Sequence, residues 1–305
     1  METLSCSASL EGLKHKLGYD GLFVVDRVGR SGGFALFWQS KFKVRLLKFG
    51  RTFIDVEVSN SDMGVWRVMG YYGYPKSTRR RESWNLLRHI ASFSTLPWVC
   101  LGDFNDLLDS SEKKGSRPHA SWKIQGFRSA VVDARLSNLG MVGYQFTWER
   151  GRGTSKWVKE RLDRVLTSSS WCDKFPNTRV QSLEANSSDH LPIFLDPAHN
   201  LSPASRNNRF RFENLWLREA DCEQIVRGSW EDTTDFSIQQ KLSACGVKLM
   251  NWGGHMIHDF RNRLKDYKTH MRLLRGRRDI EGLVEFTEIR KRYNELLHNH
   301  EIFWK

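Results

Sequence analysis

Short runs in which apolar and polar residues alternate fill the first two thirds of the chain and most constrain its fold. The segments FKVRLLKF (42–49) and TFIDVEVS (52–59) show the period of two that is typical of half-buried strands. Gly50 and Arg51 stand between them and predict a hairpin. Similar apolar runs predict strands at residues 21–28, 32–38, 65–74, 97–105, 144–149, 180–185 and 191–196. Helical spacing of apolar residues predicts helices at 78–93 and 121–136, so we expect an α/β fold.

The pattern changes after Asp196. The segment PAHNLSPASRNN (197–208) is polar and carries two prolines, which predicts a linker. Apolar residues between 257 and 274 then recur alternately every three and four positions, as in a heptad seam. The glycine pair 253–254 and Gly276 are predicted helix ends. We therefore expect a first domain at 1–197, a linker at 198–208 and an α-helical tail at 209–305.

The charge balance indicates the kind of partner. Lysine and arginine number 48 against 35 aspartate and glutamate, which gives a formal net charge of +13 and a sequence pI near 9.7. A field of this sign attracts phosphate backbones and accelerates encounters with them. We therefore expect a nucleic-acid partner, although a basic surface also serves plain solubility.

Other sequence features exclude several classes of protein. No apolar run approaches the roughly 20 residues that span a bilayer. The opening METLSCSASLEGLKHKLG has no basic region followed by an apolar core, so it is not a secretory signal. The five cysteines are dispersed and include no CxxC pair, which argues against a disulfide framework or a zinc site and for reduced thiols in an intracellular protein.

Three short polar motifs stand at or near the ends of apolar strands. They are GDFN (102–105), RLDR (161–164) and SDH (188–190). Strand ends often present catalytic groups, because the strand is rigid and its end is open to solvent. Each motif alone is more often a turn or a helix cap. Their order along the chain, with SDH directly before an apolar strand, is much more specific.

The sequence resembles the endonuclease/exonuclease/phosphatase superfamily, and more closely the endonuclease of plant non-LTR (LINE-type) retrotransposons. The resemblance covers roughly residues 2–196 and rests on motifs in the family's order, namely the strand from Gly32-Gly33 to Trp38, YYGYP (71–75), PWVCLGDFND (97–106), FTW (146–148), ERLDRVL (160–166) and SSDHLPI (187–193). It implies a two-sheet β-sandwich flanked by helices in four layers, a divalent-metal site at one end and hydrolysis of a phosphodiester. A DNA substrate and a nuclear location of a functional protein follow from the same resemblance, and residues 209–305 resemble the connector that follows this endonuclease.

The resemblance also implies roles for individual residues. Asp103 matches the base that activates the attacking water, and Asn105 matches the amide that holds this base and the phosphate. His190 matches the group that binds the scissile phosphate. Asp163 matches the carboxylate that orients this histidine, and Tyr72 a phosphate-contacting tyrosine. These residue types suit the chemistry, because in-line attack needs a deprotonated water and a neutralised phosphate.

Two positions match the family's metal ligands. Asp189 matches the carboxylate near the metal, and Glu2 matches a glutamate that binds Mg²⁺ (or Mn²⁺). The strand that precedes this glutamate in the family, an internal element of the sheet, is missing from the sequence. Its loss predicts exposed backbone and apolar surface, a frayed metal site at Glu2, and low activity or none.

The tryptophans divide into two predicted groups. Trp66, Trp84, Trp98 and Trp148 lie within predicted strands or helices and are expected in the core. Trp122 lies in the segment RPHASWKIQGF (117–127), which is predicted to be exposed near GDFN. Aromatic residues interleaved with basic ones suit nucleic acid, so Trp122 and Arg117 are candidate substrate-binding residues.

Three functions remain open on the sequence. The first is a metal-dependent DNA endonuclease, which the motif order and net charge favour. The second is a non-catalytic retrotransposon remnant that binds nucleic acid or nothing, which the missing strand favours. The third is a phosphatase acting on small phosphate esters, because one fold hosts many substrates.

Overall fold

The computed structural model describes residues 5–27, 33–115, 117–185, 188–198, 210, 212, 216–217 and 219–301. The chain divides into two compact units, residues 1–201 and residues 202–305, each with its own packed interior. Most of the predicted linker 198–208, and Glu2, lie outside the described residues.

A six-stranded sheet in the order β3-β4-β5-β6-β12-β8 forms the centre of the first unit. Its strands are β3 (Lys43–Gly50), β4 (Phe53–Asn60), β5 (Gly64–Tyr72), β6 (Trp98–Asp103), β12 (Asp163–Thr167) and β8 (Ser137–Asn138). Strands β3 and β4 form the predicted hairpin. Only β5 and β6 are parallel among the pairs of this sheet, and the crossover between them contains the short η1 (Ser77–Arg79) and α2 (Arg80–Ala91). Because they are parallel, the carboxyl ends of β5 and β6 emerge side by side.

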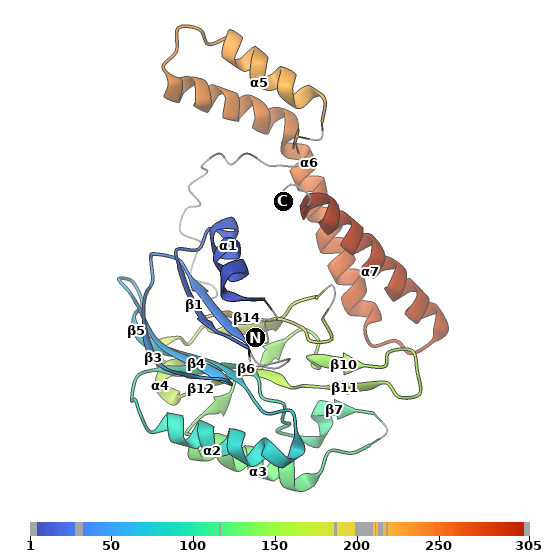
Figure 1. Cartoon of the computed structure of the whole chain (residues 1–305). Coiled ribbons are helices and arrows are strands. Elements are labelled where there is room, and N and C mark those ends of the chain that lie inside the picture. Colours follow the sequence, from blue (N-terminus) through green and yellow to red (C-terminus); the bar gives the residue numbers. More distant parts are fainter. Residues whose placement is uncertain are drawn as a thin grey trace. The chain divides into compact units, whose positions relative to one another are not determined.

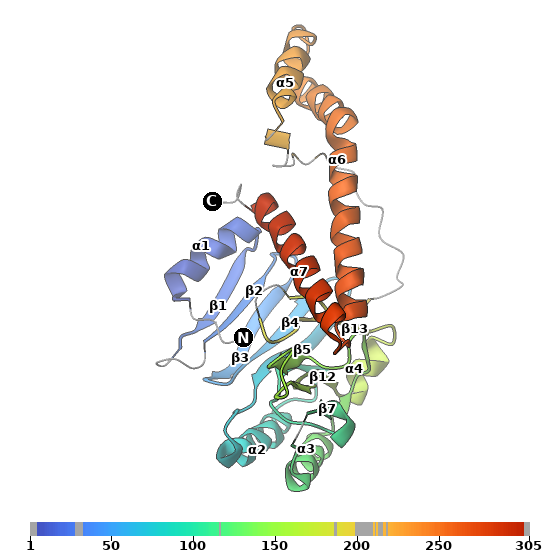
Figure 2. The ribbon, with the colours of Figure 1, turned by 90° about the vertical axis from the view of Figure 1, so that its right-hand side faces the viewer.

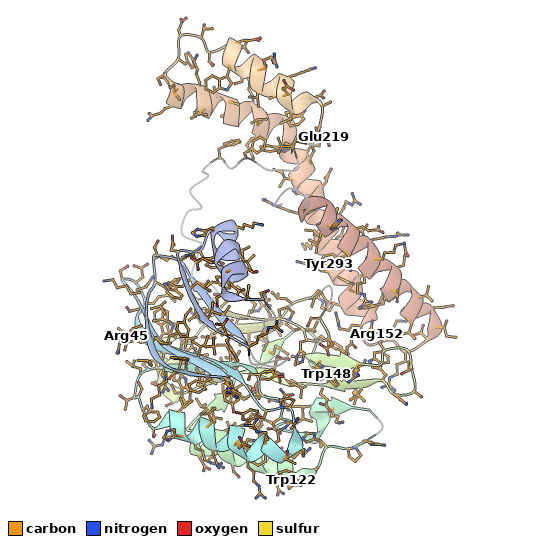
Figure 3. The ribbon with its side chains drawn as sticks, in the orientation of Figure 1. Arg45, Trp122, Trp148, Arg152, Glu219 and Tyr293 are labelled. Atoms are coloured by element: carbon orange, nitrogen blue, oxygen red, sulfur yellow. The ribbon has the colours of Figure 1, made fainter. Side chains whose placement is uncertain are left out.

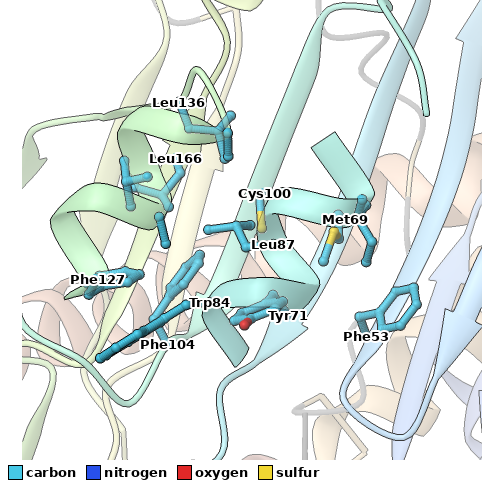
Figure 4. Packing of buried hydrophobic residues seen from close by; sticks show 14 of the residues in the cluster. Phe53, Met69, Tyr71, Trp84, Leu87, Cys100, Phe104, Phe127, Leu136 and Leu166 are labelled. Atoms are coloured by element: carbon cyan, nitrogen blue, oxygen red, sulfur yellow. The ribbon is translucent and has the colours of Figure 1, made fainter. Parts of the chain in front are cut away.

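One face of this sheet is covered by α2 and α3 (Ser121–Asp133), as Figure 1 shows. The helices pack against each other and bury Trp84, Leu87 and Phe127 against the strands. Figure 4 shows how these side chains interlock with Met69 and Tyr71 of the sheet. Both helices confirm the helical segments predicted from apolar spacing.

The other face of the six-stranded sheet is covered in separate pieces. At one end lie β1 (Gly21–Val25) and β2 (Phe34–Trp38), which pair only with each other. At the other end lies a sheet in the order β14-β13-β9, formed by Ile193–Asp196, Arg179–Ser182 and Met141–Val142. The helix α1 (Ser7–Leu17) lies against β1 on the outside (Figures 1 and 2).

The predicted mixed α/β sandwich with outer helices is confirmed, with one difference. The second layer is not one continuous sheet, because no described strand lies between β2 and β14. The remaining elements are a small sheet in the order β10-β11-β7 (Trp148–Arg150, Val158–Glu160, Lys113–Lys114), the 3-10 turn η2 (Ser110–Glu112) and the helix α4 (Ser169–Lys174). The predicted strand 144–149 is therefore shorter than expected and begins only at Trp148.

The second unit consists of α5 (Asp221–Glu231), α6 (Ile238–Leu274) and α7 (Ile280–Glu301). The predicted helix end at Gly253-Gly254 is wrong, because α6 continues through both glycines. The missing side chain of Gly253 makes room for Trp216, whose indole nitrogen donates to the Gly253 carbonyl over 3.1 Å. Gly276 does lie just after the end of α6. In the described part of the chain, no helix combines the length and the apolar character needed to cross a membrane.

Candidate active site

The three polar motifs come together in one pocket of about 610 Å³. Asp103 is the last residue of β6, Asp163 is the first residue of β12, and His190 lies just before β14. All three line the pocket, together with Asp189 and Tyr72. The ends of neighbouring strands thus bring together side chains that are up to 118 positions apart in the sequence, Tyr72 and His190.

Asp103 and Asp163 face each other across the β6–β12 pair. Their Cα atoms are direct register partners, and each side chain is only 7% exposed. Nδ1 of His190 lies 2.8 Å from Oδ2 of Asp163, and its Nε2 lies 3.9 Å from Oδ2 of Asp103. The imidazole, itself about a third exposed at 32%, therefore lies within ion-pair distance of both carboxylates.

Asn105 fixes the orientation of Asp103. Its backbone N–H donates to Oδ1 of Asp103 over 2.7 Å, and its side-chain Nδ2 donates to Oδ2 over 2.8 Å. The same Nδ2 also donates to the carbonyl of Gly73. Asn105 has a φ of 55°, in the left-handed region that asparagine tolerates better than most residues. Both oxygens of Asp103 are thereby held by one residue.

Thr147, in the FTW segment (146–148), is a site residue whose role no local sequence pattern predicts. Its hydroxyl oxygen accepts from the backbone N–H groups of Leu162 and Asp163, over 3.0 and 2.9 Å. The residue is fully buried, at 0% exposed. Thr147 therefore holds the start of β12, and with it the Asp163 carboxylate, through two buried hydrogen bonds.

Trp148 belongs to the core only in part, because it is packed against the buried cluster of Leu107, Ile124 and Leu162 without being fully buried itself. It is half-buried, and its indole Nε1 donates to Oδ2 of Asp189 over 2.9 Å. The backbone N–H of Glu149 donates to the Asp189 carbonyl as well. A partly buried indole N–H needs a hydrogen-bond acceptor. Here the acceptor is Asp189, and the bond orients its carboxylate in the pocket. Trp66, Trp84 and Trp98 are buried as predicted.

The two candidate substrate-binding residues lie apart from the pocket lining. Arg117 is exposed, and Trp122 at the start of α3 is 47% exposed. Figure 3 places Trp122 on the helical layer, where its ring meets that of Trp84 edge to face. Trp84 in turn donates to the buried Asp106, next to GDFN in the sequence. Trp122 is thus exposed as predicted, and its ring packs against the buried Trp84, which Asp106 holds in place.

Burial and the neighbouring charges shift the pKa values of Asp103 and His190. Burial, and then the negative charge of Asp163, raise the pKa of Asp103 to about 7. Burial alone would lower the pKa of His190, but the hydrogen bond and charge of Asp163, and then the charges of Asp103 and Asp189, raise it to about 9. His190 is therefore cationic at neutral pH, while Asp103 titrates near neutrality and can take up a proton.

The fold and the pocket define a class of protein, a mixed α/β sandwich with an acid–histidine site at the ends of its central strands. Residues 6–190, more than half of the chain, match the model of the Endonuclease/Exonuclease/phosphatase family. The chain belongs to this family, whose members are in general hydrolytic enzymes. No curated protein matches the chain.

Several solved structures are similar in fold. The endonuclease domain of TRAS1, a telomere-specific non-LTR retrotransposon, is 14% identical with a TM-score of 0.46, and the match covers 64% of this chain and 93% of that one. Beta toxin from Staphylococcus aureus is 16% identical with a TM-score of 0.40, over 56% and 70% of the two chains. ANGEL2, a 2',3'-cyclic phosphatase, is 15% identical with a TM-score of 0.39, over 61% and 76%.

Proposed function

We propose that the protein is a metal-dependent phosphodiesterase that cleaves DNA, of the kind found in LINE-type retrotransposons. The observation that carries this proposal is the convergence of Asp103, Asp163 and His190 in one pocket, with Asn105 holding the first of them. A general base and a cationic phosphate ligand then line the one pocket that a phosphodiester would enter. The family shown by the chain, and its net charge of +13, support a polyanionic substrate.

In this proposal the residues divide the work as follows. Asp103, with a pKa near neutrality, takes a proton from the attacking water at one carboxylate oxygen. His190, held in its cationic form by Asp163, donates a hydrogen bond to the phosphate oxygen on which charge develops. Tyr72, beside Asp103 in register, lines the pocket where it can contact the phosphate.

The donor chemistry of the pocket fits a hard divalent cation, Mg²⁺ or Mn²⁺. Three carboxylates, those of Asp103, Asp163 and Asp189, line the pocket beside one imidazole, that of His190. Hard cations take oxygen ligands, and we assign Asp189, together with Glu2, as the holders of the ion. No group of three His, Cys, Asp or Glu side chains is arranged for a metal within the described ranges, which leave out Glu2. When bound, the ion supplies positive charge to the phosphate and the leaving oxygen.

Arg117 and Trp122 are proposed to contact DNA outside the pocket. The exposed indole offers a stacking face, and the ammonium of Lys123 lies 5.8 Å from its ring centroid. Arg117 adds a positive charge in the same short segment. Neither residue takes part in the bond cleavage itself.

Nicking of supercoiled plasmid in Mg²⁺ tests the proposed function. Asp103→Asn and His190→Ala are each expected to slow nicking by about 10²- to 10⁴-fold, the usual range for an acid–base group. The exposed Asp173→Asn serves as the matched control and should nick at the wild-type rate. Chelation of divalent metal should abolish cleavage, and restored Mg²⁺ should recover it.

Three outcomes would contradict the proposal. Equal nicking by wild type and Asp103→Asn would mean that the activity is not from this site. Absence of any cleavage by the folded protein would favour the non-catalytic remnant. Faster turnover of small phosphate monoesters than of DNA would favour the phosphatase.

A further inference from the structure

An apolar groove adjoins the catalytic pocket and extends it along the inner face of the six-stranded sheet. Its floor is formed by Val68 and Gly70 of β5 and Leu101 of β6, and its walls by Leu36 of β2 and Ile193 of β14. At one end the floor continues into Tyr72, Asp103 and Asp163. The groove and the candidate active site therefore share one pocket.

The floor of this groove differs in burial from the sheet on either side of it. On the same face, Ile54 and Val56 are buried beneath β1 and β2, and Val99 and Val165 are buried on the side of β13 and β14. Val68, Gly70 and Leu101, which pair with these residues in register, are only partly buried. Among the residues that the structure describes, no strand covers this strip of inner sheet surface between the two covered zones.

Both walls of the groove end in the edge of a strand. Among the described residues, β2 pairs only with β1, and β14 pairs only with β13. A strand edge presents a row of backbone N–H and C=O groups at regular spacing, which another extended backbone can satisfy. A lipid chain or a nucleobase would fill apolar space without satisfying these groups.

We propose that the groove binds an extended polypeptide strand, which adds to the edges of β2 and β14 and joins them into one layer. The spacing of the floor residues requires small apolar side chains at every second position of that strand. Three carboxylates (Asp103, Asp163, Asp189) against one imidazole (His190) line the catalytic end. The strand therefore carries a cationic residue, and not an acidic one, where it approaches this end. Peptide binding here does not require the proposed hydrolytic activity, although the groove and the candidate active site share one pocket.

Binding of fluorescent peptides to the full chain in metal-free buffer tests this inference. The probe is a nine-residue peptide of alternating valine and threonine with lysine at both ends. One comparison peptide carries proline at its centre, which removes a backbone donor and breaks the strand. Another carries glutamate in place of lysine. We expect the lysine peptide to bind, and the proline and glutamate peptides to bind at least tenfold more weakly.

The glutamate comparison separates a specific site from general attraction. Because the whole chain has a net charge of +13, non-specific binding would favour the glutamate peptide. A preference for the lysine peptide therefore reports the acidic end of the groove. A preference for glutamate, or equal binding of the proline peptide, overturns the proposal.

Two glycine-to-leucine variants, one inside the groove and one outside it, form a matched pair that tests whether the groove is the binding site. A Cβ atom at Gly70 meets no other atom within 4 Å, so Gly70→Leu can occupy the groove without a clash at its first carbon. Gly140 lies outside the groove and is equally unobstructed, which makes Gly140→Leu the control. We expect Gly70→Leu to weaken peptide binding at least tenfold and Gly140→Leu to leave it unchanged.

Hydrogen exchange on the wild-type protein decides the question even if Gly70→Leu does not fold. The bound lysine peptide should slow amide exchange in Phe34–Trp38 and Ile193–Asp196, the two walls of the groove. Binding without protection at these strands overturns strand addition. Displacement of the peptide by a fatty acid, or dimerisation that competes with it, would assign the groove to those occupants instead.

Discussion

At the scale of single residues, His190 and Asp163 form the pair on which the charge of the pocket depends. The folded protein holds the pKa of His190 at about 9, above its ordinary value of 6.5, because the Asp163 carboxylate accepts a hydrogen bond from Nδ1–H over 2.8 Å. Folding therefore favours the protonated imidazole. The contribution of the pair to stability is fully present below pH 6.5 and is lost as the pH rises through about 9.

Titration of His190 by NMR checks this pair in the metal-free protein. The wild-type midpoint should lie near 9, and Asp163→Asn should lower it, because the main group that favours the charged imidazole is removed. Urea unfolding should show a loss of stability between pH 6.5 and pH 9 that Asp163→Asn reduces. His255→Ala, at an exposed position, should keep the wild-type pH profile. A wild-type midpoint near 6.5 would contradict the assignment.

The sequence allowed some residues of the site to be predicted and not others. Asp103, Asn105, Asp163 and His190 each belong to a motif, so the residue type and its place at a strand end were visible in the chain. The structural task of Thr147 depends on two backbone N–H groups about 15 positions away, which no local pattern contains. The roles assigned to these motif residues, and to Tyr72, Asp189, Glu2, Arg117 and Trp122, all stay predictions.

At the scale of elements, a buried ion pair holds the sheet and the helical layer together. Arg67 of β5 makes a two-pronged contact with Asp55 of β4, over 2.9 and 2.7 Å, and both side chains are almost fully buried. Arg67 also donates to the carbonyl of Ile90 in α2, and its guanidinium lies over the ring of Trp98. One side chain thus connects three elements around the core.

Removal of one partner of the buried Arg67–Asp55 pair should lower the stability of the protein much more than removal of one partner of an ion pair at the surface. Asp55→Ala leaves the Arg67 charge buried without its carboxylate, so we expect the free energy of unfolding to fall by about 3–5 kcal/mol. The exposed pair Arg45–Glu57 joins β3 to β4 and provides the comparison. Glu57→Ala should lower the free energy of unfolding by about 1 kcal/mol or less. Urea denaturation of both variants measures the difference, and similar losses would contradict this account.

Errors in predicting elements came from contacts between distant parts of the chain. The glycine pair in α6 resembled a helix end, but Gly253 is required by the packing of Trp216, which lies 37 positions earlier. The helix α1 was not predicted, because only Leu10 of its side chains is buried. Strands with clear alternation, such as β3 and β4, were located to within a residue or two.

At the scale of the whole molecule, the chain consists of two units with separate cores. The first unit ends at Leu201 and contains every residue that lines the candidate active site. Its largest cluster lies between α2, α3 and the six-stranded sheet, while two other clusters lie within the helices of the second unit. The family resemblance implied the layers of the first unit and the loss of an internal strand, whereas the coordinates were needed to locate the gap between β2 and β14 among the described residues.

Residues 1–201 are expected to fold without the helices that follow. The isolated fragment should keep the near-UV circular dichroism of its tryptophans. Its thermal midpoint should stay within about 4 °C of the corresponding transition in the full chain, which is equivalent to about 1 kcal/mol for a domain of this size. A fragment that is unfolded at 25 °C would show that the second unit is part of its stability.

Because Asp103 and Asp163 are direct register partners, the site forms only when β12 pairs with β6 in the correct register. A slip of β12 by one residue would place Leu162 or Arg164 opposite Asp103 and turn Asp163 to the far side of the sheet. A molecule with this register would have no catalytic activity, and not just a reduced rate. The specific activity of a purified sample would then be proportional to the fraction of molecules in which β12 pairs with β6 in the correct register. Two samples with equal helix and strand content could therefore still differ in turnover.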